Sequence, residues 1–237
     1  MPESQVIPWK RILIEATAIV ASILLAFAID AWWSARVDQS RNVDQLEAIA
    51  TEFIDLEHKL KLHEIRLIGL RQAVSNLLSH IGPNSKRQTV DSLYTLIDLS
   101  FRASKIELQS GSLQALLASG ELSAISGDEL KALLASWPAQ VSRLRNQSGL
   151  LEGNREEIIG YLHDKVPTLA IAYKTNEMTH YPEPSFVGKP EALQRDMKVE
   201  GLFGNRGMMI EDTLNIISEI KAQLVKVTNL IAAELQD

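Results

Sequence analysis

The side chains best suited to metal binding and proton transfer near neutral pH are histidines. The chain has five of them: His58, His63, His80, His163 and His180. No two lie four residues apart, so the H-E-x-x-H pattern of zinc hydrolases is absent. Glu177 and His180 form one Glu-x-x-His, whereas a di-iron bundle needs two such pairs and further glutamates. We therefore predict that the chain holds no metal and no other cofactor.

No motif for nucleophilic catalysis is present either. The sequence contains no G-x-S-x-G and no cysteine, and its Ser/Gly-rich stretch lacks the pattern of a phosphate-binding loop. In "GLFGNRG", Gly201, Gly204 and Gly207 precede an expected helix, where backbone amides could bind an anion. A flexible entry to that helix is the simpler interpretation. We predict no catalytic residues and interpret the protein as a non-enzyme.

The elements that would position any site begin with a long apolar run. Ile12 to Trp33 comprises 22 residues, enough helix to cross roughly 30 Å of hydrocarbon. Tryptophans stand at both ends of it, as they do at membrane interfaces: Trp9, Trp32 and Trp33. We predict a short N-terminal tail (1–11), a transmembrane helix (12–34) and an extramembrane domain (35–237).

Two alternatives are open for the apolar run. Ala26-Phe27-Ala28, behind Lys10 and Arg11, resembles the cleavage site of a secretory signal. Against cleavage, Glu15 would interrupt the apolar core of the signal, and the run continues past the cut. Against a buried soluble helix, the run shows no alternation of apolar and polar faces.

A carboxylate stands near each end of the predicted membrane helix. Glu15 and Asp30 are fifteen residues apart, about 22 Å along a helix axis. Both could simply reach into the headgroup region. Alternatively, Glu15, Ala18, Ser22 and Ala26 form one stripe of mostly small residues, with Asp30 about 60° away, and such stripes allow helices to approach closely. We predict that this stripe is a contact between membrane helices.

The flanks of the helix suggest its orientation. Lys and Arg are balanced, with two on each side, whereas the total charge is more positive before the helix than after it. This favours a cytoplasmic N-terminus. We expect a single-pass protein of the bacterial inner membrane whose main domain lies in the periplasm.

Beyond the membrane helix, apolar residues recur at alternating spacings of three and four. This heptad seam predicts one long helix over about 43–79, either separate from the membrane helix or continuous with it. Its one polar member is His63, which we interpret as a core or interface residue rather than a ligand. The seam consists of Leu46, Ile49, Phe53, Leu56, Leu60, His63, Leu67, Leu70, Val74, Leu77 and Ile81.

The centre of the chain predicts shorter helices. One covers about 90–103. The unit L-x-A-L-L-A-S then occurs at 113–119 and at 130–136, and a Gly-containing turn between the two copies predicts a helical hairpin. Ser126 and Glu129 have the spacing of a capping box at the start of the second helix.

The second half of the chain continues the pattern. That helix keeps its heptad spacing to Leu162, and Pro138 should kink or restart it. A Pro-rich, irregular segment follows at 164–190, and long loops of this kind are often functional. The last helix covers about 205–236 and should pack against the heptad seam. The sequence thus predicts an all-α protein: a transmembrane helix followed by an antiparallel helical bundle with long coiled-coil-like helices.

Part of this pattern resembles an uncharacterised family of bacterial single-pass membrane proteins. The resemblance lies in Glu15 early in the membrane helix, in Asp30-x-Trp32 at its end, and in the L-x-x-S-G-x-L-x-x-I turn from Leu116 to Ile125. It covers about the first 165 residues, and the last helix more loosely. It implies a single N-terminal membrane helix followed by a helical domain, and it implies no reaction.

The composition limits the classes of partner that the chain is expected to bind. The formal charge is −6 and no Lys/Arg cluster forms a basic stripe, which argues against nucleic acid. The bilayer is one expected partner, and a second copy of the chain or another membrane protein is the other. We therefore favour an interaction or scaffold protein, such as one subunit of a membrane complex. The alternative is a module that senses or binds a small molecule outside the cytoplasm.

An uncleaved anchor is directly testable. N-terminal sequencing of the protein extracted from membranes should return the residues that precede Ile12, because Glu15 and the long apolar run disfavour cleavage. A mature chain that starts at Ile29 would instead identify a removed signal.

Overall fold

The computed structural model describes residues 9–86, 88–175, 180–186 and 188–236, with the backbone alone at 9–12, 14 and 38. The described chain has no β-strand, and the predicted all-α class is confirmed. The elements are α1 (Trp9–Leu78), α2 (Val90–Ser100), α3 (Gly111–Ser119), η1 (Glu121–Ala124), α4 (Asp128–His163), α5 (Thr168–Lys174), η2 (Pro190–Arg195) and α6 (Met197–Glu234).

The chain divides into two units, residues 1–48 and 49–237. The helix α1 is continuous through both, so the two helices that the sequence left open as separate or joined are one. In the first unit, the described side chains from Leu13 to Val37 are all exposed. The second unit contains the rest of α1 and every other element, and its packing is described by itself below.

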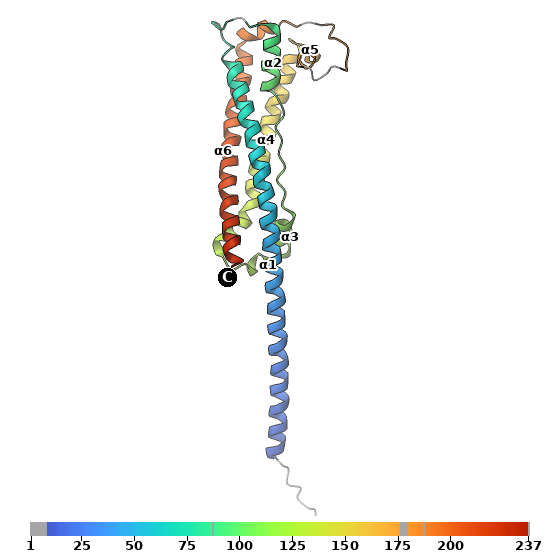
Figure 1. Cartoon of the computed structure of the whole chain (residues 1–237), viewed down its shortest axis with the longest axis vertical. Helices are drawn as coiled ribbons and strands as arrows, with labels where there is room; N and C mark the ends of the chain where they lie inside the picture. Colours follow the sequence, from blue (N-terminus) through green and yellow to red (C-terminus); the bar gives the residue numbers. More distant parts are fainter. Residues whose placement is uncertain (1–8, 87, 176–179, 187, 237) are drawn as a thin grey trace, which may run out of the picture. The chain divides into compact units, whose positions relative to one another are not determined.

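Three long helices form the frame of the second unit (Figure 1). α6 runs antiparallel to α4: Asn154 Nδ2 donates to the Leu202 carbonyl, while Gln223 Nε2 donates to the Leu133 carbonyl. α6 is also antiparallel to α1: Lys221 Nζ lies 2.6 Å from Glu64 Oε2, whereas Glu211, earlier in α6, pairs with Arg71, later in α1, at 3.4 Å. α1 and α4 are therefore parallel.

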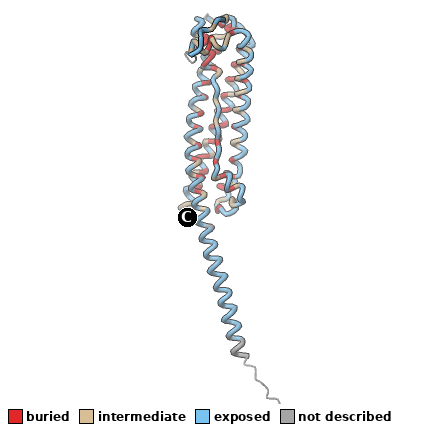
Figure 2. The backbone as a smooth tube through the Cα atoms, turned by 90° about the vertical axis from the view of Figure 1, so that its right-hand side faces the viewer, coloured by how far each residue is buried: buried red, intermediate tan, exposed pale blue. Residues whose placement is uncertain are grey.

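The heptad seam of α1 is the side that packs in this frame. Its members from Ile49 to Leu77 are all buried, and Ile81, beyond the helix, is half-buried. The seam faces α6, where Gly207 lies against Val74, as the sequence predicted. It also faces α4: the rings of Phe53 and Trp137 lie 4.7 Å apart between centroids. Figure 2 shows the buried positions along the inner side of each long helix.

Several expected boundaries are wrong. α6 begins at Met197, so Gly201, Gly204 and Gly207 lie inside a helix and cannot form an anion site at its start. The N-cap of α4 is Gly127, which has no side-chain cap, and the expected capping box of Ser126 and Glu129 is therefore absent.

The reasons for these differences are local. Asp196 begins α6 because its carboxylate accepts from the Lys198 amide at 3.0 Å, a stronger start than the glycines offer. Ser126 donates its amide to Glu234 at 2.7 Å instead of capping α4. The segment 164–190 is not wholly irregular, since it contains α5, and α4 passes through Pro138 without a break.

The fourth side of the frame is not a single helix. α2 ends at Ser100, earlier than the sequence predicted, and α3 begins at Gly111. Between them, residues 102–110 have no helix; we call this segment the strap. In Figure 1 the strap runs along the frame from α2 at one end to α3 at the other. The second unit is therefore an up-down-up-down arrangement whose second member is helix–strap–helix.

Distances along α1 show that the strap is nearly fully extended. Ala103 and Leu70 line one hollow, while Ser110 bonds to Glu52. The rise of α1 from Glu52 to Leu70 is about 27 Å. The seven steps from Ala103 to Ser110 reach at most about 25 Å when extended. Only an extended backbone, with side chains bridging the rest, connects these two points.

Two arginines fix the end of the strap that follows α2. The Arg206 guanidinium is buried and donates to three carbonyls: Ser100 at 2.7 Å, Arg102 at 2.8 Å and Leu151 at 3.2 Å. Arg155 Nε donates to the Phe101 carbonyl at 2.9 Å. The carbonyls of Ser100, Phe101 and Arg102 lie at the end of α2, where a helix leaves its acceptors unpaired and its dipole favours a cation. The arginines therefore complete the end of α2 and allow the chain to leave it extended.

A carboxylate fixes the other end of the strap, which precedes α3. Glu52 accepts from the Ser112 amide at 3.0 Å, from the Ser112 hydroxyl at 2.8 Å and from the Ser110 hydroxyl. Ser110 is in turn the N-cap of α3 and accepts from the Leu113 amide. Burial would raise the pKa of Glu52, but the hydrogen bonds from Ser110 and Ser112 outweigh it and lower that pKa. An anion at the start of α3 thus mirrors the cations at the end of α2.

Arg206 should contribute far more to stability than a surface arginine. Arg206→Met leaves three carbonyls without their donor, two of them beside the end of α2, and should lower the free energy of unfolding by about 3 kcal/mol. Arg143→Met, which removes an exposed ion pair with Glu219, should cost less than about 1 kcal/mol.

Urea unfolding followed by helix content, with both variants in the same detergent, makes this comparison. Equal losses for the two variants would show that the Arg206 hydrogen bonds do not stabilise the fold.

Candidate functional site

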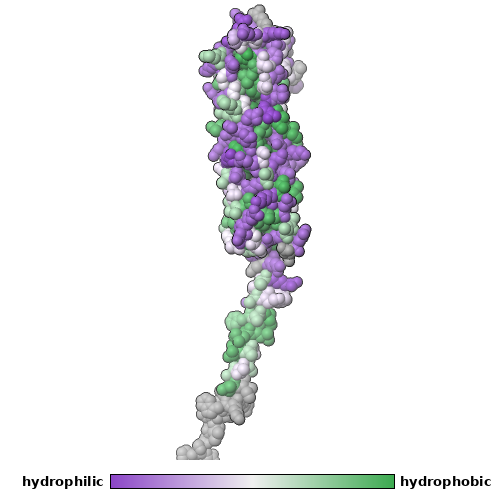
Figure 3. Space-filling model, turned by 90° about the vertical axis from the view of Figure 1, so that its left-hand side faces the viewer, coloured by the Kyte–Doolittle hydropathy of each residue, from purple (hydrophilic) through white to green (hydrophobic). Residues whose placement is uncertain are grey.

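The apolar segment of α1 is the first candidate site, because nothing in the structure covers it. One helix of the described chain is long and apolar enough to cross a membrane, and no residue of its most apolar window is buried. On the face seen in Figure 3, apolar side chains cover most of the described part of this segment. Single exposed side chains are normal on proteins, but a continuous apolar surface of this kind is not.

The predicted contact stripe lies within this exposed segment. Glu15, Ala18, Ser22, Ala26 and Asp30 are all exposed and share one helix. The Ser22 hydroxyl donates to the Ala18 carbonyl at 2.7 Å, within the same helix. This bond satisfies the hydroxyl and leaves a small, smooth surface at Ser22, so close packing rather than hydrogen bonding is what the stripe can offer.

Two of the three predicted interfacial anchors, Trp32 and Trp33, have side chains that the structure describes. The rings of Trp32 and Trp33 lie 6.5 Å apart, and the Arg36 guanidinium lies 5.9 Å from the centre of the Trp32 ring. A cation beside an exposed aromatic pair suits the boundary between hydrocarbon and water. Of the third anchor, Trp9, only the backbone is described, so its side chain lies outside the described part.

His63 is the polar member of the seam, and the structure buries it without a partner. Its side chain is 2% exposed, and neither ring nitrogen has a hydrogen bond. Burial, with a smaller effect of the nearby Arg66 charge, lowers the pKa of His63 to about 4. Imidazole is therefore neutral at physiological pH and acts as a packing residue that resists protonation.

Metal binding has no support among the described residues. No group of three or more His, Asp or Glu side chains in that part of the chain could hold an ion. The lone Glu-x-x-His is only half visible, since Glu177 lies outside the described residues.

A charged cluster surrounds the start of α6. Asp196 Oδ2 accepts from the Tyr161 hydroxyl and from Lys165 Nζ, both at 2.7 Å. The ammonium groups of Lys165 and Lys198 lie 4.7 and 4.5 Å from the centre of the Tyr161 ring. The Lys165 hydrogen bond is the main cause that lowers the pKa of Asp196 to about 2. Because Asp196 also caps α6, this cluster is explained as a helix start tied to the end of α4.

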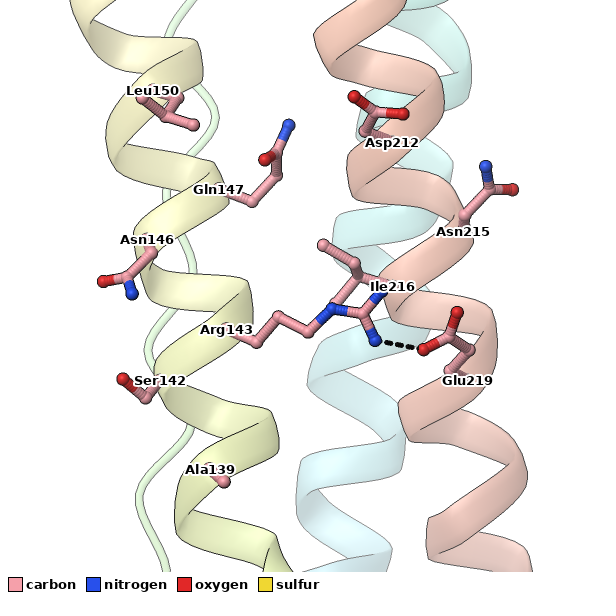
Figure 4. Close-up of a pocket in the computed structure, with 10 residues that line it drawn as sticks. All are labelled: Ala139, Ser142, Arg143, Asn146, Gln147, Leu150, Asp212, Asn215, Ile216 and Glu219. Carbon is pink, nitrogen blue, oxygen red and sulfur yellow. Dashed lines mark hydrogen bonds and ion pairs between the residues drawn. The ribbon is translucent and has the colours of Figure 1, made fainter.

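A polar hollow of about 730 Å³ lies on the surface between α4 and α6. Figure 4 shows the Arg143–Glu219 ion pair at one end and Gln147 and Asp212 farther along. Its lining is mostly amides and charges, with Leu150 exposed at the edge. The groups do not converge on one point, so the hollow suits a hydrated polar contact rather than catalysis.

The sequence did not reveal the side chains that fix the strap and so define the fourth side of the frame. Glu52 lies inside helical sequence with no motif around it, and Arg206 lies in "GLFGNRG", where the glycines and not the arginine drew the prediction. The strap did have a visible pattern: within "ASKIELQS", less polar and strongly polar residues alternate from Ser104 to Ser110. This period of two was overlooked because the segment lies between two helical patterns.

Comparison with known proteins adds no relative. No protein family, curated protein or solved structure matches the chain. The resemblance to a bacterial single-pass membrane family therefore stays a prediction.

The burial of His63 predicts how the free energy of unfolding depends on pH. In the unfolded chain imidazole titrates near 6.5, and in the folded protein at about 4. Below pH 6.5 the unfolded state therefore binds a proton that the folded state rejects. Stability should be full above pH 6.5 and should decline towards pH 4, by on the order of 3 kcal/mol.

Urea unfolding between pH 7 and pH 5 tests this, a range above the titration of most carboxylates. His63→Leu should abolish most of the decline in the free energy of unfolding. His58→Gln, on the exposed side of α1, should keep it. A decline that persists unchanged in His63→Leu would place the responsible group elsewhere.

Proposed function

We propose that this protein is a membrane-anchored helical interaction or scaffold protein, and that it serves as a subunit of a membrane complex. The exposed apolar segment of α1 is the observation on which this proposal rests. In water such a surface would be unfavourable by about 25 cal/mol per Å² of apolar area, and a bilayer removes that cost. We place the anchor in a bacterial inner membrane and the helical domain in the periplasm. The proposal includes no reaction.

The proposed contact within the membrane is the stripe of Glu15, Ala18, Ser22, Ala26 and Asp30. Lipid chains are as apolar as leucine, so small residues favour helix contacts by letting backbones approach. A carboxylate at this depth is more stable beside protein or water than beside lipid. The stripe would bind either a second copy of the chain or the membrane helix of another protein.

A second candidate function rests on the hollow between α4 and α6. At about 730 Å³ it has the size of a ligand site, and Arg143, Asp212 and Glu219 offer both signs of charge. A small polar molecule bound there would make the domain a periplasmic sensing or binding module. We rank it second because the hollow is open and its charged groups are already partly paired.

The stripe predicts how substitutions in the membrane change assembly. Ser22→Ile should weaken the assembly at least about tenfold, because a branched side chain prevents close approach. Leu24→Ile changes a residue away from the stripe at constant volume and should have little effect. Cross-linking in native membranes, followed by purification of the complex, measures both.

Two outcomes would contradict the proposal. Unchanged assembly of Ser22→Ile would show that the stripe faces only lipid. Extraction of the protein by salt or alkali without detergent would show that α1 is not an anchor. A C-terminal alkaline-phosphatase fusion tests the orientation separately, and an inactive fusion would move the domain to the cytoplasm.

A further inference from the structure

The strap has the side-chain pattern of a β-strand. Exposure alternates strictly from Ala103 to Ser110: odd positions are exposed, and even positions are half-buried or buried against the helices. Ile106 and Leu108 are the apolar members of the inner face, and Lys105 and Glu107 belong to the outer face. This period of two is the pattern of a strand with one side packed and one side in solvent.

What the strap lacks is a partner strand. None of the backbone N–H or C=O groups of residues 103–109 has a hydrogen bond within the described chain. By contrast, the carbonyls of residues 100–102, just before this stretch, all accept hydrogen bonds from Arg206 or Arg155. A row of unpaired backbone groups in an extended segment is a template for another strand.

A hollow lies beside the strap on its α1 side. Its volume is about 540 Å³, and Leu70, Ala73 and Leu99 supply most of its apolar wall, with Ala103 at the strap. Gly69 also lines it, and a Cβ added there would meet nothing within 4 Å. The hollow exists because a strand is about half as wide as a helix and fills less of the space beside α1.

The apolar wall continues along α1. Leu62 and Ile65 are 42% and 56% exposed, and they precede Arg66 and Gly69 by one turn on the same face of the helix. These side chains are not part of the heptad seam, so packing within the frame does not account for them. They extend the apolar strip parallel to the strap.

The charges around this surface are mostly positive, although the whole chain carries −6. Arg66 lines the hollow and has no ion-pair partner in the described chain. Arg102 lines it too, with its side chain about half exposed and paired to Asp98. Lys105 lies on the outer face of the strap. A ligand in this place would gain from carrying acidic groups.

We propose that an extended, acidic segment of a partner protein adds to the strap as a second β-strand, starting from the hollow at its α2 end, where the strap and α1 are not yet joined by the bond between Ser110 and Glu52. Its backbone would pair with the strap, its apolar side chains would cover Leu62, Ile65 and Leu99, and its carboxylates would pair with Arg66 and Arg102. This deepens the proposed interaction role and rests on it. An acyl chain or a partner helix would cover the apolar wall but leave the backbone groups of the strap unpaired.

Amide hydrogen exchange of the full-length chain in lipid nanodiscs tests the pairing residue by residue. The probe is the acetylated and amidated peptide V-E-V-E-V-E-V, and the control is E-E-V-V-V-V-E, which has the same composition without alternation. On saturation with the first peptide, every second amide of the strap should exchange at least about tenfold more slowly than without peptide, because alternate N–H groups point to one edge. The amides between them should be unaffected.

Two variants locate the site without disturbing the fold. Gly69→Leu fills the hollow and should weaken binding of the alternating peptide at least about tenfold, while helix content and melting stay as in the wild type or improve. Gly149→Leu is the matched control, an exposed helical glycine on α4 with open space around it, and should bind like the wild type. Arg66→Glu should weaken binding and shift the preference away from acidic peptides.

Three results would overturn the proposal. The first is no protection of strap amides by the alternating peptide, or equal protection by the control peptide. The second is wild-type binding to folded Gly69→Leu. The third is slower exchange, on addition of dodecyl phosphate, of the backbone amides of residues that line the hollow, with no effect of either peptide, which would make the surface a lipid site. None of these results bears on the membrane stripe, whose test is the assembly of Ser22→Ile.

Discussion

A buried guanidinium joined to three backbone carbonyls determines how the helical domain is built. Arg206 reaches from α6 to Ser100 and Arg102 on one side and to Leu151 of α4 on the other. No carboxylate pairs with it at these positions, so its charge depends on carbonyl dipoles and on the C-terminal end of α2. Burial lowers the pKa of Arg206 to about 10, which still leaves it charged at neutral pH. α2, α4 and α6 are thereby tied at one level.

The consequence is a frame in which one member changes its conformation halfway. Because the carbonyls at the end of α2 are satisfied by side chains, the backbone can leave the helix without burying unpaired acceptors. Glu52 performs the complementary role at the start of α3 by accepting from its first amides. Between these two points the strap covers in nine residues a length that would require about twice as many in a helix.

The narrow strap also explains irregularities elsewhere in the domain. The oxygens of Ser104 and Ser148 and both nitrogens of His63 are buried without partners in the described chain. Leu62 and Ile65 stay exposed on α1, and a hollow opens beside Gly69. A fourth continuous helix would cover most of this surface. The structure therefore gives up some internal packing where it presents a free strand edge, a trade that is common at binding sites.

The sequence alone determined the features that depend on short-range periodicity. An apolar run without a polar face, followed by a heptad seam, was enough to separate an exposed segment from a packed one on the same helix, and the seam from Ile49 to Leu77 is buried as its spacing implied. Helix boundaries were predicted less well, since Asp196 caps α6 at Met197, whereas the sequence pattern placed the start of the last helix near residue 205. Only the tertiary structure decided that Arg206 would be buried and that Glu52 would be half-buried at the start of α3, because their partners lie 55–106 and 58–60 residues away along the chain and leave no local trace. The strap lies between these cases: its alternation is written in "ASKIELQS", but whether its edge is paired or open depends on which elements fold beside it.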